Sequence, residues 1–142
     1  MKITNKTNEY REKMRLGCIS EFGETDPEFV EIFENFAFDE VVNQDDLDDK
    51  TRFMAIIATL IGCQAIDIYK DILPVALNFE VTPIEVKEIV YQAVAYLGMA
   101  RVFPFLKATN EILKCRGIKL PLEGQSTTNR ENRRESGTKV QV

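Results

Sequence analysis

Three polar side chains share one spacing, because Glu88, Gln92 and Tyr96 follow one another at intervals of four residues. Residues four apart lie on one side of an α-helix, so a carboxylate, an amide and a phenol would form a row. Glu88 could then act as a general base, while Gln92 and Tyr96 orient a ligand. The alternative is structural: Glu88 pairs with a basic side chain such as Arg52, and the other two satisfy buried polar groups.

A second candidate for chemistry is the thiol of Cys63, which follows Gly62 at a predicted junction between helices. The N-terminus of the next helix would favour the thiolate, which is the nucleophilic form of cysteine. The alternative is an inert, buried cysteine that packs as a small apolar residue. Cys18 and Cys115 are distant in sequence and no C-x-x-C pair occurs, so the spacing indicates neither a disulfide framework nor a zinc site.

The sequence contains no histidine, which removes the commonest general base and the commonest metal ligand. We therefore expect no metal and no other cofactor. A net charge of −5 argues against nucleic-acid binding through a broad basic face. Residues 24–49 carry many acidic side chains and no Lys or Arg. This acidity indicates either a site for a cation or a basic partner, or two acidic helix starts joined by a solvated loop.

The 142 residues suit one domain with a substantial hydrophobic core. The longest apolar stretches, such as residues 53–63, are too short to cross a bilayer. The N-terminal residues lack the apolar region of a signal peptide. We therefore expect no membrane partner and a cytoplasmic location.

The N-terminal third predicts two helices. Residues 1–23 indicate a polar start and a short helix that ends near Gly23, with Tyr10, Met14 and Ile19 directed inward. Asp26 and Pro27 predict the start of the second helix, as its capping residue and its first helical residue. The apolar residues that follow at helical spacing are Phe29, Val30, Phe33, Phe36 and Ala37.

Four more helices are predicted over residues 46–61, 64–78, 82–98 and 99–116. Gly62 is expected to end the first of these, and Pro74 to kink the second. The third begins with a capping box, in which a Thr82 hydroxyl and a Glu85 carboxylate cap each other's backbone. We expect an all-α, compact bundle of about six helices. Its divisions would be N-terminal helices (1–45), a helical core (46–117) and a polar C-terminal tail (118–142).

Several sequence motifs lie between residues 46 and 117: DKTR at 49–52, ALN at 76–78, VTPIEV at 81–86 and EIVYQAVAYLG at 88–98. In these motifs the chain resembles the carboxymuconolactone decarboxylase family, which includes the alkyl hydroperoxidase D branch. The resemblance implies an alkyl hydroperoxidase D-like helical fold that is oligomeric, as a homotrimer or homohexamer. It also implies sites in clefts between helices and neighbouring chains.

The resemblance also shows what this chain lacks. A histidine that the family's lactone decarboxylases use corresponds to Ile72 here. The C-x-x-C pair of the peroxidase branch would fall near Ala65 and Ile68, and Cys63 lies two residues before the first of these positions. A peroxidase of this kind needs one cysteine to attack the peroxide and another to resolve the product.

These observations predict a carboxymuconolactone decarboxylase-like protein of unknown specific activity that binds a small organic ligand or is a degenerate member. The candidate catalytic residues are Cys63 and Glu88, and the candidate ligand-binding residues are Gln92, Tyr96 and Arg52. The alternatives are a divergent thiol peroxidase that uses Cys63, or a lactone isomerase or decarboxylase that uses Glu88. A third possibility is one half of a larger unit, whose C-terminal tail docks on a neighbouring chain or another module.

Overall fold

A computed structural model describes residues 2–14, 22–44 and 46–123, and these residues form helices and no strand. The all-α prediction is therefore confirmed for this part of the chain, whereas Cys18, Ile19 and most of the polar tail lie outside it. In chain order the helices are α1 (Asn5–Met14), α2 (Phe22–Thr25), α3 (Pro27–Asn35), the π-helical η1 (Phe36–Glu40), α4 (Asp49–Gly62), α5 (Ile66–Asn78), α6 (Pro83–Leu97) and α7 (Met99–Cys115). Within the described ranges, no helix is long and apolar enough to cross a membrane.

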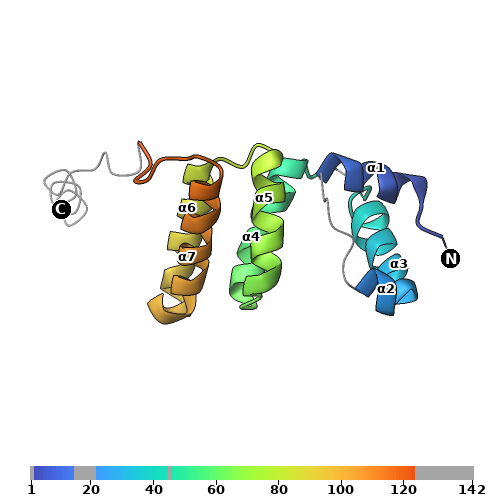
Figure 1. The fold of residues 1–142 in the computed structure, drawn as a ribbon, viewed down its shortest axis with the longest axis horizontal. Helices are drawn as coiled ribbons and strands as arrows, with labels where there is room; N and C mark the ends of the chain where they lie inside the picture. Colours follow the sequence, from blue (N-terminus) through green and yellow to red (C-terminus); the bar gives the residue numbers. More distant parts are fainter. Residues whose placement is uncertain (1, 15–21, 45, 124–142) are drawn as a thin grey trace, which may run out of the picture.

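Helices α4 to α7 form a four-helix bundle, in which α4 packs on α5 and α6, and α7 packs on α5 and α6. Figure 1 shows that α1, α2 and α3 lie beside the α4/α5 pair, on the side away from α6 and α7. The chain is therefore elongated, with a four-helix bundle and a smaller N-terminal group. The bundle core contains Phe53, Ile57, Ile61, Tyr69, Leu73, Ala76, Val86, Val90, Val102 and Phe105, all at most 2% exposed.

Tyr10 of α1 connects the N-terminal group to the bundle. Its ring stacks between Phe38 and Phe79, with centroid distances of 6.1 and 6.0 Å. Its hydroxyl donates a 2.9 Å hydrogen bond to Oδ1 of Asp49, the first residue of α4. Burial and the Asp49 carboxylate both raise the pKa of this tyrosine. Phe79 stacks in turn on Phe53 at 4.7 Å, so the contact reaches the bundle core.

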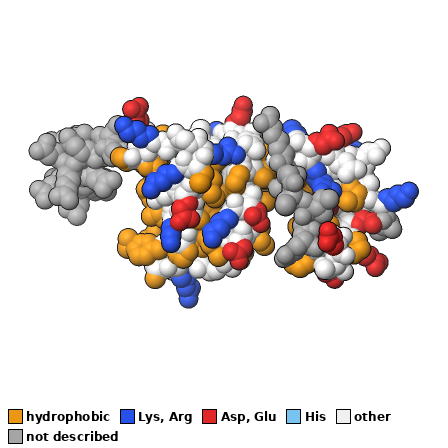
Figure 2. Space-filling model, viewed as in Figure 1, with side chains coloured by type: hydrophobic (Ala, Val, Ile, Leu, Met, Phe, Trp, Pro, Cys, Tyr) orange, Lys and Arg blue, Asp and Glu red, His pale blue; other side chains and the backbone are white. Residues whose placement is uncertain are grey.

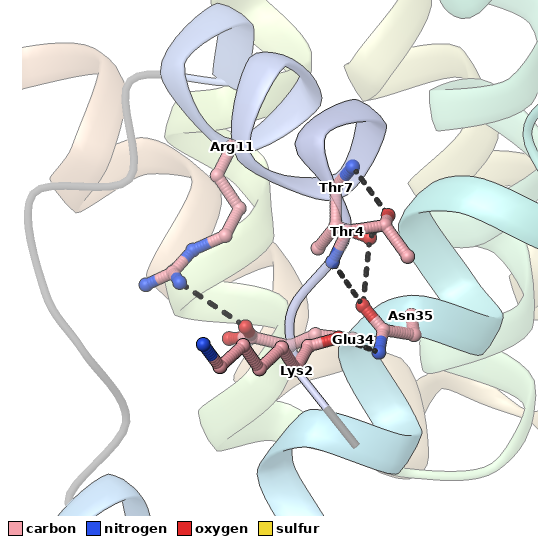
Figure 3. Close-up of polar contacts among 6 residues, drawn as sticks. All are labelled: Lys2, Thr4, Thr7, Arg11, Glu34 and Asn35. Atoms are coloured by element: carbon pink, nitrogen blue, oxygen red, sulfur yellow. Dashed lines mark hydrogen bonds and ion pairs between the residues drawn. The ribbon is translucent and has the colours of Figure 1, made fainter.

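A buried amide holds α1 against α3 (Figure 3). The Asn35 Oδ1 atom accepts hydrogen bonds from the Thr4 N–H at 3.0 Å and the Thr7 hydroxyl at 3.1 Å. Its Nδ2 donates to the Lys2 carbonyl at 3.1 Å. Beside it, Arg11 forms an ion pair with Glu34 at 3.2 Å. The residues before α1 are thus tied to a helix more than 25 positions further along the chain.

The helix ends of the bundle follow the local sequence. The capping box at the start of α6 is confirmed, because the Glu85 N–H donates to the Thr82 hydroxyl while the Thr82 N–H donates to the Glu85 carboxylate. The Thr82 N–H and then the Lys50 ammonium, 2.9 Å away, lower the pKa of Glu85. Gly98, with φ of 85°, ends α6, and Gly117, with φ of 77°, follows α7.

Two local predictions are wrong, and a third is confirmed with a different backbone geometry. Gly23 lies inside α2 instead of ending a helix, and α1 ends at Met14. Asp26 is the residue before α3 but its side chain makes no capping bond; its carboxylate accepts the Thr25 hydroxyl at 2.7 Å. The prediction that the helix ends at Gly62 is confirmed, because Gly62 is the last residue of α4, but the left-handed residue that follows is Gln64, with φ of 61°. The Gln64 side chain donates to the Ile61 carbonyl at 2.8 Å and so satisfies a helix-terminal acceptor.

Candidate functional site

A groove of about 530 Å³ lies between α4 and α6. Its lining residues are Met54, Ala58 and Gly62 of α4, and Glu85, Glu88, Ile89, Gln92, Ala93, Tyr96 and Leu97 of α6. Small side chains make the hollow, since Ala58 and Ala93 face it from opposite helices. A Cβ atom added at Gly62 would meet no atom within 4 Å, so the groove is open at that end of α4.

The structure places Glu88, Gln92 and Tyr96 in this groove, in the row that their spacing predicts. All three are exposed, and Tyr96 is 84% exposed. Among the residues that the structure describes, none forms a hydrogen bond or an ion pair with the Glu88 carboxylate. The polar groups of the row are therefore accessible to a ligand. This exposure argues against the alternative in which Gln92 and Tyr96 form hydrogen bonds with buried polar groups.

Arg52 does not join this row. Its Nη2 donates to the carbonyl oxygens of Val42 at 3.2 Å and Leu47 at 3.0 Å, which anchors the loop before α4. The ion pair between Arg52 and Glu88 that the sequence suggested is therefore not formed, and Arg52 binds backbone carbonyl groups instead. A different cation, Lys50, pairs at 2.9 Å with Glu85, which lines the groove.

The residues of α4 that line the groove were not among the predicted site residues. Met54, Ala58 and Gly62 are also spaced by four residues, and this spacing is the signal that they share one side of α4. The spacing does not show that this side of α4 faces Glu88, Gln92 and Tyr96, because the packing of α4 against α6 is a tertiary contact.

Cys63 is exposed at the C-terminal end of α4 and does not line the groove, although Gly62 beside it does. Its Sγ lies 3.6 Å from the Leu60 carbonyl oxygen, to which the thiol donates a weak hydrogen bond. The alternative interpretation predicted that Cys63 is buried, and this part of it is wrong. Cys63 and Glu88 are not brought together in one site, and Cys115 is exposed at the end of α7.

Two acidic side chains at the end of the stretch 24–49 stabilise nearby helices through hydrogen bonds and an ion pair. Asp48 caps α4 by accepting the Thr51 N–H at 2.9 Å. Asp49 accepts from the Tyr10 hydroxyl at 2.9 Å and from Lys13 at 2.5 Å. Among the described residues, no three Cys, Asp or Glu side chains are grouped so that they could hold a metal ion. These contacts favour acidic helix starts over a cation site.

One buried ammonium lies elsewhere on α6. Lys87 is 5% exposed and donates to the Oδ1 of Asn110, which is a neutral partner. Burial removes water from the ammonium and lowers the pKa of Lys87.

We expect Lys87→Met to stabilise the protein by about 1 kcal/mol near pH 7, because it removes a buried charge without a charged partner. The unfolded chain binds more protons than the folded chain between the lowered pKa and the ordinary lysine value of about 10.4. Wild-type stability should therefore rise with pH across this window, and the advantage of the variant should shrink. Urea unfolding at pH 7 and pH 10 measures both effects, with exposed Lys107→Met as control. A variant less stable than wild type at pH 7 would contradict the expectation.

Comparison with known proteins agrees with the helical architecture. The sequence model of the "Carboxymuconolactone decarboxylase family" matches residues 27–111, a span that includes every residue lining the groove. A search of curated proteins found no match to the chain.

Proposed function

Because the chain belongs to the carboxymuconolactone decarboxylase family, we propose that it uses this helical scaffold to bind a small organic molecule between α4 and α6. The observation that carries the proposal is the groove itself, in which apolar walls meet the carboxylate of Glu88, which has no partner among the described residues. Its volume of about 530 Å³ is in the range of small-molecule sites. Apolar lining with a few polar groups is also typical of such sites.

The residues that line the groove favour a ligand of particular chemistry. Met54, Ile89 and Leu97 favour an apolar body. Glu88 accepts hydrogen bonds or pairs with a cation, since its charge has no partner among the described residues. A second carboxylate, Glu85, lies in the same groove, although Lys50 pairs with it. We therefore propose a neutral or cationic ligand with a hydrogen-bond donor at one end, because an anion would be repelled.

Three probes of one shape test this assignment: benzylamine, benzyl alcohol and benzoate. We expect benzylamine to bind most tightly and benzoate least, with dissociation constants of roughly 1 mM for the better probes, as is usual for fragments of this size. Titration of the 142-residue chain, followed by two-dimensional NMR, should shift the amide signals of the lining residues. Glu88→Gln should remove most of the preference for the amine over the alcohol.

Matched alanines on α4 supply the control. Ala58→Phe should fill the groove and weaken benzylamine binding at least tenfold, whereas Ala55→Phe should not, because Ala55 is exposed on the same helix outside the groove. Binding that is equally strong in both variants would refute the site. So would the absence of any shift in wild type at 10 mM probe.

A thiol peroxidase is the second candidate, and the exposure of Cys63 favours it. It predicts that the protein consumes peroxide with a dithiol reductant, and that Cys63→Ser abolishes the turnover. Equal background rates in the two proteins would exclude this activity. The probe titrations do not depend on this thiol, so the two candidates are tested separately.

A further inference from the structure

The groove between α4 and α6 is long. Lys50 and Glu85, close to the starts of the two helices, form an ion pair at 2.9 Å. Gly62 and Leu97 each lie twelve residues further along the chain, and both line the groove. The two helices therefore run side by side in the same direction. Twelve residues of helix correspond to roughly 18 Å, which is the length of the groove.

The groove is also narrow. Its volume of about 530 Å³, spread over roughly 18 Å, leaves a mean cross-section of roughly 30 Å². An α-helix is about 10 Å across, so its cross-section is more than twice as large. Packed carbon atoms lie about 4 Å apart, and one hydrocarbon chain therefore occupies roughly 15–20 Å². These dimensions suit a single unbranched chain and are too small for a helix of a partner protein.

The two ends of the groove differ. At the N-terminal ends of the helices, the ion pair between Lys50 and Glu85 bridges α4 and α6. Towards the other end, the α4 side chains that line the groove become smaller in the order Met54, Ala58 and Gly62. A Cβ atom added at Gly62 would meet no atom within 4 Å. The groove is therefore bridged at one end and open at the other.

Two rows of α6 side chains line the groove along its length. The polar row consists of Glu88, Gln92 and Tyr96. The apolar row, one position further along in each turn, consists of Ile89, Ala93 and Leu97. Glu88 lies about one turn from the bridged end, but nine residues, or roughly 14 Å, before Leu97. A cation beside Glu88 therefore leaves room for an apolar chain in one direction only, towards the open end.

We propose that the ligand is a primary amine with an unbranched alkyl chain, which rests on the binding function proposed for this groove. The ammonium group pairs with the Glu88 carboxylate, which has no partner among the described residues. The alkyl chain follows the apolar row and leaves the groove past Gly62. Gly62 then sets the longest chain that the groove accepts, because a larger side chain at this position would stand across the open end.

A series of n-alkylamines from butylamine to dodecylamine tests this geometry in the 142-residue chain. Each added methylene should tighten binding roughly threefold, since complete burial of a methylene is worth about fourfold. The gain should stop near ten carbons, because a chain of about 1.3 Å per carbon then spans the roughly 14 Å from Glu88 to Leu97. All titrations stay below the concentrations at which the amines aggregate.

Two-dimensional NMR reports the orientation of the chain. Butylamine should shift the amide signals near Glu88 and Met54. Decylamine should shift these signals and, in addition, those of Gly62 and Leu97 at the open end. Butylamine that shifts only the signals at the open end would overturn the proposed orientation.

Gly62→Leu tests the open end. The leucine side chain has space, since nothing lies within 4 Å of its Cβ position, and leucine favours a helix more than glycine does. We therefore expect the variant to fold, which circular dichroism checks. Its binding of decylamine should weaken at least tenfold more than its binding of butylamine, because only the longer chain reaches position 62. An equal loss for the two amines would overturn the role of Gly62.

An alkyl chain can also adhere to hydrophobic side chains outside the groove. Figure 2 shows such side chains at the N-terminal helices, where Phe29 and Phe33 are more than half exposed. Ala55→Leu is therefore the matched control, because Ala55 is exposed on α4 and does not line the groove. It should bind the whole series like wild type. Equal weakening of decylamine binding in Ala55→Leu and Gly62→Leu would overturn the proposal.

The series separates this proposal from the function on which it rests. If benzylamine binds but the affinity of the alkylamines does not change with chain length, the alkyl ligand is wrong and the groove function stands. If neither benzylamine nor any alkylamine binds, both are refuted.

Discussion

Replacing Tyr10 with alanine should lower the free energy of unfolding by about 4 kcal/mol, the usual cost of deleting a buried aromatic ring. The ring is 8% exposed and stacks between Phe38 and Phe79. Its loss would open a cavity where the N-terminal group meets the bundle. The Asp49 carboxylate would also lose the tyrosine hydroxyl and keep Lys13. We expect the N-terminal helices to open at lower urea concentration than the bundle.

Urea unfolding gives the total loss, and amide hydrogen exchange shows where it occurs. Tyr10→Phe is the matched control, because it keeps the stacked ring and removes only the hydrogen bond to Asp49. Its cost should be about 1 kcal/mol. If Tyr10→Ala costs no more than Tyr10→Phe, the stacked ring does not connect the two parts of the chain.

Asn35→Leu should destabilise the protein by about 3 kcal/mol, although leucine has nearly the same shape. The Lys2 carbonyl and the Thr4 N–H lose their partner, and the Thr7 hydroxyl loses one of its two partners, since the Thr4 hydroxyl stays 2.9 Å away. Thr7 is fully buried, so water cannot replace the lost bond without a local opening. Unpaired buried polar groups cost about 1–3 kcal/mol each, and part of this cost is relieved by such an opening.

The exposed Asn43 supplies the control for this amide. Its side chain donates to Asp39, four residues before it, and Asn43→Leu should change stability by no more than about 1 kcal/mol. Thermal unfolding compares the two variants, and NMR follows exchange at the Thr4 amide. Equal melting temperatures for the two variants would show that the buried network adds nothing to stability.

Features set by neighbouring residues could be predicted from the sequence. The capping box of Thr82 and Glu85 involves two residues three apart, and Gly98 ends α6 through its own backbone conformation. The helical period alone placed Glu88, Gln92 and Tyr96 in one row. The predicted side-chain cap of α3 is not formed, since the Asp26 carboxylate accepts the Thr25 hydroxyl and makes no bond to the backbone of α3.

The fold class, the family motifs and the polar row were thus determined by the sequence itself. Only the tertiary structure decided what faces the row, because Ala58 and Gly62 reach it through the packing of α4 on α6. It also decided that Arg52 binds the carbonyls of the preceding loop, and that Phe29 and Phe33 of α3 are more than half exposed within the described ranges. The physical reason is the same in each case. A periodic pattern shows that a helix has an apolar or polar side, but which distant segment covers that side depends on the packing of the whole chain.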